Sequence, residues 1–148
     1  MKRHLFLTGE KGVGKSTLID LLLERAGGRA GGFRTRRVFT VRPGEATVHL
    51  LRAATDEQPC EENLLFSCPA PGEDMVGRFD SLGCAALRDG EGCGLLLMDE
   101  LGPHEAEAEG FQRAVTAALD GESRVLGVLQ RADSPFLAAI AAREDVAV

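Results

Sequence analysis

The stretch GEKGVGKST, residues 9–17, holds the residue types that bind phosphate through main-chain groups. It meets the spacing G-x-x-x-x-G-K-[ST] with Gly9, Gly14, Lys15 and Ser16. Glycines let a loop bend so that successive N–H groups point inward, and a helix starting near Lys15 adds the positive end of its dipole. In such a loop the lysine reaches the β- and γ-phosphates and the serine hydroxyl binds Mg²⁺. We therefore predict a phosphate-binding loop (Walker A) made of Gly9, Glu10, Lys11, Gly12, Val13, Gly14, Lys15, Ser16 and Thr17.

Two carboxylates follow the apolar run LLLM, at Asp99 and Glu100. In parallel sheets, ligands gather at the carboxyl ends of the strands. We expect Asp99 to hold Mg²⁺ together with Ser16, and Glu100 to orient and deprotonate an attacking water. By itself the pattern also fits two acids that merely end a strand. Combined with the phosphate-binding loop, it favours hydrolysis of ATP, GTP or another nucleoside triphosphate over simple binding.

Gln130 and Arg131 end another apolar run, RVLGVLQ. If this run forms a strand beside both the loop strand and the Asp99 strand, Gln130 lies near the γ-phosphate. Arg131 then stabilises charge in the transition state, as arginine fingers do. The alternative for Arg131 is a solvated loop residue.

Three arginines, Arg34, Arg36 and Arg37, share the segment GGFRTRRV. Alternation along a strand places Arg34 and Arg36 on one face, and Thr35 and Arg37 on the other. The cluster either complements the nucleotide or keeps an edge strand solvated. The sequence leaves both interpretations open.

Apolar runs alternate with helical patterns along the chain, and three of the runs are continuous enough to need cover on both faces. We expect an α/β architecture: a single three-layer P-loop NTPase domain over residues 1–148, with a mostly parallel central sheet flanked by helices, RecA-like with an additional strand. Expected strands span 3–8, two runs within 31–53 around the Pro43-Gly44 turn, 94–100, 124–130 and 145–148. Expected helices span 16–28, 76–90, 105–121 and 134–143, and residues 53–75 are expected to form a long loop with one short helix.

Composition narrows the class of protein. The net charge of −6 argues against nucleic-acid binding, and no apolar run approaches a membrane span of about 18 residues. The opening MKRHLFLTGE has too short an apolar run for a signal peptide, so we expect a cytoplasmic monomer. Trp and Tyr are absent, which predicts weak base selectivity. Cys60, Cys68, Cys84 and Cys93 lack zinc-ligand spacing and are expected to be free thiols, with a Cys60–Cys68 redox pair as the less favoured alternative.

With these motifs in order, the chain resembles the cancer-related and thermophilic nucleoside-triphosphatase family of P-loop proteins. RHLFLTGEKGVGKSTLI is similar to the family's opening, and GGFRTRRV, VGRFDSLG and LLLMDELGPHEAEAEGFQRAV are similar to its later segments. The resemblance implies Mg²⁺-dependent hydrolysis of nucleoside triphosphates with broad base tolerance. The chain departs from the family pattern at Pro103, where a lysine is common, and at Arg36 or Arg37, where glutamate is common. It ends at Val148, before a C-terminal segment that helps close the site in longer members, so slow turnover is expected.

Two rival functions remain. A small nucleotide or metabolite kinase would need a basic lid, but the long segment TDEQPCEEN is acidic and would repel an anionic acceptor. A non-hydrolysing nucleotide-binding regulator would have no use for Glu100 as a base. Both are weaker than hydrolysis.

Overall fold

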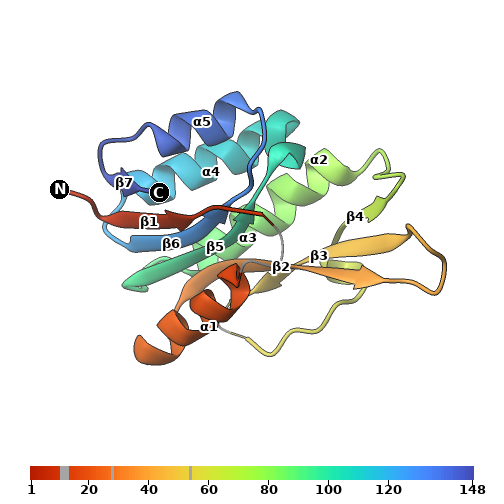
Figure 1. Cartoon of the computed structure of the whole chain (residues 1–148), viewed down its shortest axis with the longest axis horizontal. Coiled ribbons are helices and arrows are strands. Elements are labelled where there is room, and N and C mark those ends of the chain that lie inside the picture. The colour runs from red at the N-terminus through yellow and green to blue at the C-terminus, as the bar shows by residue number, and fades with distance from the viewer. Residues whose placement is uncertain (11–13, 28, 54) are drawn as a thin grey trace.

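The computed structural model describes residues 1–10, 14–27, 29–53 and 55–148. Seven strands form one sheet in the order β4-β3-β2-β5-β6-β1-β7 (Figure 1). The neighbours from β2 to β7 are parallel, while β3 and β4 extend the sheet as antiparallel strands. The strands are β1 His4–Leu7, β2 Gly31–Phe39, β3 Ala46–Arg52, β4 Leu64–Cys68, β5 Leu95–Leu101, β6 Arg124–Leu129 and β7 Val146–Ala147.

Strand β6 lies between β1 and β5 and pairs with both, for example through Phe6 opposite Gly127 and Met98 opposite Gly127. This is the additional strand between the phosphate-loop strand and the Asp99 strand, as the expected fold class requires. Gly127 suits this central place because a Cβ there would overlap the ring of Phe6. The three-layer α/β expectation is thereby confirmed.

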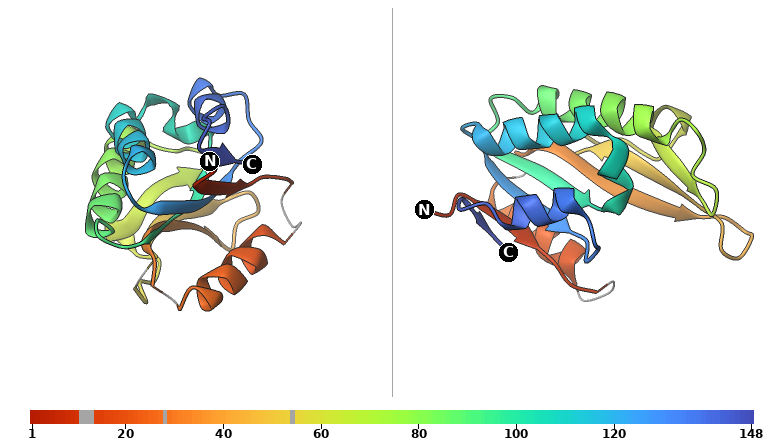
Figure 2. Two further views of the ribbon diagram at one scale, coloured as in Figure 1. Left: turned by 90° about the vertical axis from the view of Figure 1, so that its left-hand side faces the viewer. Right: turned by 90° about the horizontal axis from the view of Figure 1, so that it is seen from above.

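Helices cover both faces of the sheet unequally (Figure 2). On one face α1 is the only helix among the described residues, and its Ile19 packs against Leu97, Leu126 and Val128. The opposite face carries the larger core beneath the other helices. The helices are α1 Lys15–Arg25, α2 Met75–Arg78, α3 Cys84–Asp89, α4 Glu109–Asp120 and α5 Pro135–Ala141, with a π-helical turn at Phe79–Gly83 joining α2 to α3.

The segment expected to be a long loop is more ordered than predicted. A short 3₁₀ turn spans Glu61–Asn63, and β4 follows it directly and pairs with β3. The buried His49 ring on β3 anchors this segment, since its Nδ1 lies 2.8 Å from Asn63 Oδ1. Residues 64–68 are too few to show the two-residue period of a strand. Their pairing with β3, rather than a local pattern, makes them a strand.

The helix expected over 105–121 is divided into two elements. Pro103–Glu107 form a 3₁₀ turn, and α4 begins only at Glu109. The helix over 134–143 begins as predicted, with the Ser134 hydroxyl accepting a hydrogen bond from the Leu137 N–H. The four cysteines are free thiols, as predicted. Among the residues that the structure describes, no helix is both long and apolar enough to cross a membrane.

Candidate active site

The segment predicted to bind phosphate lies in the chain between β1 and α1. Gly9 and Gly14 have φ angles of 139° and 98°, a region that favours glycine, and Gly14 is the N-cap of α1. The ammonium of Lys15 donates to the carbonyl oxygens of Gly9 at 2.6 Å and Glu10 at 3.4 Å. Ser16 and Thr17 are exposed on the first turn of α1, whereas the predicted members Lys11, Gly12 and Val13 lie outside the described residues.

Asp99 ends the apolar part of β5 and is only 8% exposed. Its Oδ2 accepts a hydrogen bond from Arg34 Nε at 3.1 Å, and Arg34 also donates from NH1 to Asp20 on α1. The pairing follows from register, since Arg34 stands opposite Asp99 on adjacent parallel strands. Burial raises the pKa of Asp99, and the Arg34 charge opposes that rise. The sequence left open whether Arg34 complements a nucleotide or keeps an edge strand solvated, and it gave no sign of Asp20, which lies in a helix with no motif of its own.

Two oxygen donors, Ser16 and Asp99, suit Mg²⁺. A hard cation of this kind prefers carboxylate, hydroxyl and phosphate oxygens, and it usually keeps several waters. Within the described ranges no group of three or more His, Cys, Asp or Glu side chains is arranged to hold a metal. The two donors fit a metal whose other ligands are nucleotide oxygens and water, and bound Mg²⁺ would neutralise charge on the phosphates.

Glu100 and Gln130 are brought together at the ends of neighbouring strands. The pairing of β5 with β6 shifts register between Asp99 and Leu101, a bulge that re-aims the Glu100 side chain. Gln130 Nε2 donates to Glu100 Oε1 at 2.5 Å. The Gln130 main-chain N–H donates to the Leu101 carbonyl at 2.9 Å, which holds the two chain segments together.

Arg131 is not part of the Glu100–Gln130 pair. It is exposed and lines a separate cavity of about 630 Å³, together with Thr8 and Ser134. Gln130 lines both this cavity and the one beside Glu100. The structure therefore brings Gln130, but not Arg131, into contact with Glu100.

A buried carboxyl, Glu105, lies beside this site and was not predicted. It is 4% exposed, and its Oε2 accepts a hydrogen bond from the Gly102 N–H at 2.7 Å. Burial raises the pKa of Glu105 to about 8, and the nearby Glu100 adds to the rise. The sequence does place Glu105 close to Glu100, in the stretch DELGPHE at the start of the 3₁₀ turn, and that proximity could have pointed to it.

The arginines of β2 divide between the faces as alternation predicted. Arg34 lies on the α1 face with Asp99, whereas Thr35 and Arg37 line a cavity of about 280 Å³ on the other face, beside Glu100. Arg36 is exposed. Burial, and then the Arg37 charge, lowers the pKa of His104 on the rim of that cavity.

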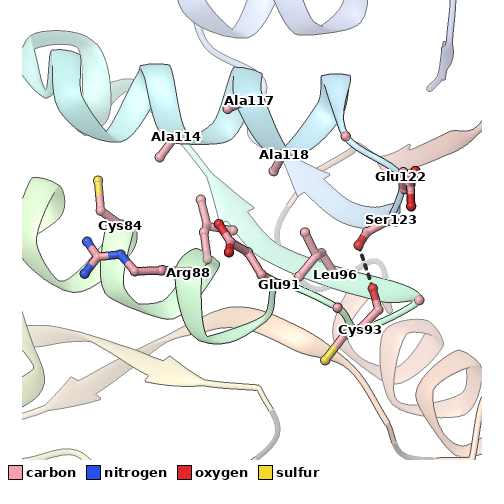
Figure 3. Close-up of a pocket in the computed structure, with 14 residues that line it drawn as sticks. Cys84, Arg88, Glu91, Cys93, Leu96, Ala114, Ala117, Ala118, Glu122 and Ser123 are labelled. Carbon is pink, nitrogen blue, oxygen red and sulfur yellow. Dashed lines mark hydrogen bonds between the residues drawn. The ribbon is translucent and has the colours of Figure 1, made fainter.

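A further cavity, of about 620 Å³, lies between α3, α4 and the start of β5 (Figure 3). Ser123, just before β6, donates to the carbonyl of Cys93, just before β5. These residues are at the amino ends of the strands, the opposite edge from Asp99 and Glu100. The cavity is therefore separate from the candidate active site.

A family profile described as "NTPase" matches residues 4–148. The chain belongs to this NTPase family. It is 30% identical over 152 residues to the nucleoside-triphosphatase THEP1 of Thermotoga maritima, covering 97% of this chain and 83% of the relative. It is 35% identical over 138 residues to the cancer-related nucleoside-triphosphatase homolog of Mus musculus, covering 80% and 70%. The predicted resemblance is confirmed.

Solved NTPase structures share the fold. The solution structure of a human cancer-related nucleoside triphosphatase has a TM-score of 0.67 and 26% identity, over 97% of this chain and 86% of that one. The crystal structure of THEP1 from Aquifex aeolicus has a TM-score of 0.66 and 23% identity, over 99% and 87%.

Proposed function

We propose that the protein hydrolyses nucleoside triphosphates to the diphosphate and phosphate, in a Mg²⁺-dependent reaction with broad tolerance of the base. The observation that carries this proposal is the contact of Glu100 with Gln130, one residue beyond Asp99, in a chain that opens with a phosphate-binding loop. A carboxylate held by an amide in this position is suited to orient a water for attack. Family membership supports the same chemistry.

Hydrolysis in this scheme is one proton transfer coupled to one displacement at phosphorus. Glu100 accepts a proton from the water as its oxygen attacks the γ-phosphorus, and the bond from that phosphorus to the β,γ-bridging oxygen breaks. Lys15 exchanges its contacts with the Gly9 and Glu10 carbonyls for phosphate oxygens and stabilises the developing charge. Gln130 keeps Glu100 oriented, and Arg131 approaches the phosphates only if its loop moves.

The loop residues 9–17 bind the nucleotide in this proposal, and Ser16 and Asp99 bind the metal. Broad base tolerance is supported by the absence of Trp and Tyr, because stacking would then rest on Phe or aliphatic side chains. Residues 1–148 act as one domain, and we propose a monomer that works in the cytoplasm without nucleic acid or membrane. The net charge of −6 is consistent with that assignment.

Phosphate release from ATP, GTP, CTP and UTP, followed with Mg²⁺ for the wild type and for Glu100→Gln, tests the proposal. Loss of a general base lowers the rate by about 10²–10⁴-fold. We expect similar rates on all four nucleotides and a loss of that size in the variant, with nucleotide binding retained. Tight binding without turnover in the wild type would instead identify a regulator. Transfer only to an added acceptor would identify a kinase.

A further inference from the structure

The cavity beside Glu100 is built by a different part of the molecule from the phosphate-binding loop. The ends of β5 and β6 supply Glu100, Gly102 and Gln130 to one wall. Thr35 and Arg37 from β2 also line it, as do His104 and Glu105 from the 3₁₀ turn and a set of apolar side chains, here called the floor. That floor consists of Val48, Leu65, Phe66 and Phe79.

The volume of this cavity exceeds the space that one attacking water needs. It measures about 280 Å³. A cavity of roughly 10–15 Å³ already holds one water, so this space is larger than one attacking water needs. A small organic or inorganic ion fits in a space of this size.

Arg37 and Glu100 are the lining groups whose charges can meet a ligand. Arg37 forms no ion pair with any described residue, and its Nη1 donates to Cys68 Sγ at 3.4 Å. Its charge is thus available to a ligand, in contrast to Arg34, which has two carboxylate partners. The Glu100 carboxylate retains acceptor positions beyond the one that Gln130 occupies.

The remaining titratable groups on the wall add little charge at neutral pH. Burial raises the pKa of Glu105 to about 8, so this carboxyl is largely protonated. Burial and the Arg37 charge lower the pKa of His104, so its ring is neutral. The lining therefore presents one cation, Arg37, and one hydrogen-bond acceptor, Glu100.

We propose that this cavity is a second binding site, separate from the phosphate-binding loop, for a small phosphate group that still carries an O–H. The anionic oxygens face Arg37, where the Thr35 hydroxyl also lies, and the O–H donates to Glu100. Hydrogen phosphate and a small phosphate ester bearing an alcohol both have this chemistry. The first is the product of the proposed hydrolysis, and the second is a co-substrate or effector.

The Glu100 carboxylate makes the site selective. Sulfate has the size and charge of hydrogen phosphate, but it carries no proton at neutral pH and would place a bare oxygen against Glu100. An acceptor facing an acceptor is repulsive and leaves both without a donor. Sulfate is therefore expected to bind at least tenfold more weakly than phosphate in this cavity.

Amide chemical shifts of the nucleotide-free protein, titrated with inorganic phosphate, test the proposal without requiring NTP hydrolysis. This readout separates the two sites, because shifts at residues 14–17 report the phosphate-binding loop and shifts at Thr35, Arg37 and Gly102 report the cavity. We expect saturable shifts in the cavity set. Arg37→Met should weaken that binding at least tenfold, whereas Arg36→Met, at a neighbouring arginine that is equally exposed but does not line the cavity, should not. Shifts confined to the loop, or equal weakening by both variants, would overturn the site.

Sulfate and Glu100→Gln test the selectivity. Sulfate should shift the loop residues but barely affect the cavity set in the wild type. The side-chain amide that Glu100→Gln introduces can donate to a bare oxygen, so this variant should bring sulfate and phosphate affinities in the cavity within about threefold of each other. Equal binding of the two anions to the wild-type cavity would contradict the role assigned to Glu100.

A parallel titration with glycerol 3-phosphate identifies the source of the ligand. If the ester binds more tightly than phosphate, the site is supported and its ligand is a phosphate ester. Tighter binding of phosphate supports it with the hydrolysis product as its ligand. Failure of both probes to shift the cavity residues would refute the site even if the protein hydrolyses nucleotides normally.

Discussion

The guanidinium of Arg34 joins Asp99 on β5 to Asp20 on α1, donating from Nε to Asp99 Oδ2 at 3.1 Å. Burial raises the pKa of Asp99, Arg34 lowers it, and the nearby carboxylates of Glu100 and Asp20 add to the rise. A cation beside a metal-binding carboxylate competes with the metal for that negative charge. In the proposed mechanism, Arg34 is thus the counter-charge that Mg²⁺ at Asp99 must share or displace.

Arg34→Met is expected to lower the Mg²⁺ concentration that gives half-maximal hydrolysis, by about three- to tenfold. Titration of the hydrolysis rate with Mg²⁺ at saturating nucleotide measures it. Arg36→Met is the matched control, since that arginine is exposed and leaves Asp99 unchanged. A higher Mg²⁺ requirement in Arg34→Met would show that Arg34 orients Asp99 for the metal rather than competing with it.

Gly102 leaves room for the side chain of Gln130. A Cβ on Gly102 would lie 2.8 Å from Gln130 Cδ, so Gly102→Ala must push this side chain away from Glu100. The backbone at Gly102 has φ −139° and ψ −175°, which alanine adopts freely, so the fold should tolerate the change. We expect the hydrolysis rate to fall about tenfold, with nucleotide affinity retained.

Gly94→Ala is the control for that substitution, because a Cβ there meets nothing within 4 Å. Hydrolysis rates and nucleotide affinities of the two variants are compared side by side. An unchanged rate in Gly102→Ala would mean that the Gln130–Glu100 contact does not orient the base.

Glu105 makes stability depend on pH. Its pKa is raised from 4.5 to about 8 in the folded protein, so the native state binds the proton more tightly than the unfolded chain does. The stability this proton contributes is complete below pH 4.5 and is lost as the pH rises toward 8. Each pH unit in that window removes up to roughly 1.4 kcal/mol.

Glu105→Gln keeps an oxygen for the Gly102 N–H and removes the titration. Urea unfolding between pH 5 and pH 8.5 should show the variant gaining stability over the wild type as the pH rises. Glu107→Gln, an exposed neighbour on the same turn, is the control. Parallel stability curves for the wild type and Glu105→Gln would contradict the raised pKa.

Gly32 sets the spacing between β2 and β5. It has a φ of 90°, and a Cβ there would overlap the main-chain oxygen of Leu97. Gly32→Ala should therefore destabilise the fold by more than about 3 kcal/mol, because backbone strain and a backbone clash add. Gly44→Ala, at a φ of 80° in an open turn, carries the strain alone and should lose about 1–2 kcal/mol. Equal losses in urea unfolding would mean that the sheet adjusts around Gly32.

Local signals in the sequence were enough for the loop glycines, the apolar strands and the two carboxylates. Each is carried by adjacent residues whose spacing reflects the geometry of one element, so Gly14 could be placed at the start of a helix and Asp99 at the end of a strand. The same holds for Ser134, which caps α5 as its type and position predict. Helical spacing did not show which apolar side chains α1 buries: Ile19 packs against the sheet and is buried, whereas Leu18 and Leu21 are exposed.

Tertiary structure alone decided the contacts between distant segments. Strand order puts β6 between β1 and β5, and only that order brings Gln130 to Glu100, 30 residues away. Register between β2 and β5 sets Arg34 against Asp99, and α1 then adds Asp20. Strand β4 forms because β3 offers an edge for pairing. Its residues Leu65 and Phe66 then line the cavity beside Glu100. Such contacts depend on how the sheet is assembled, and no local pattern of residues encodes them.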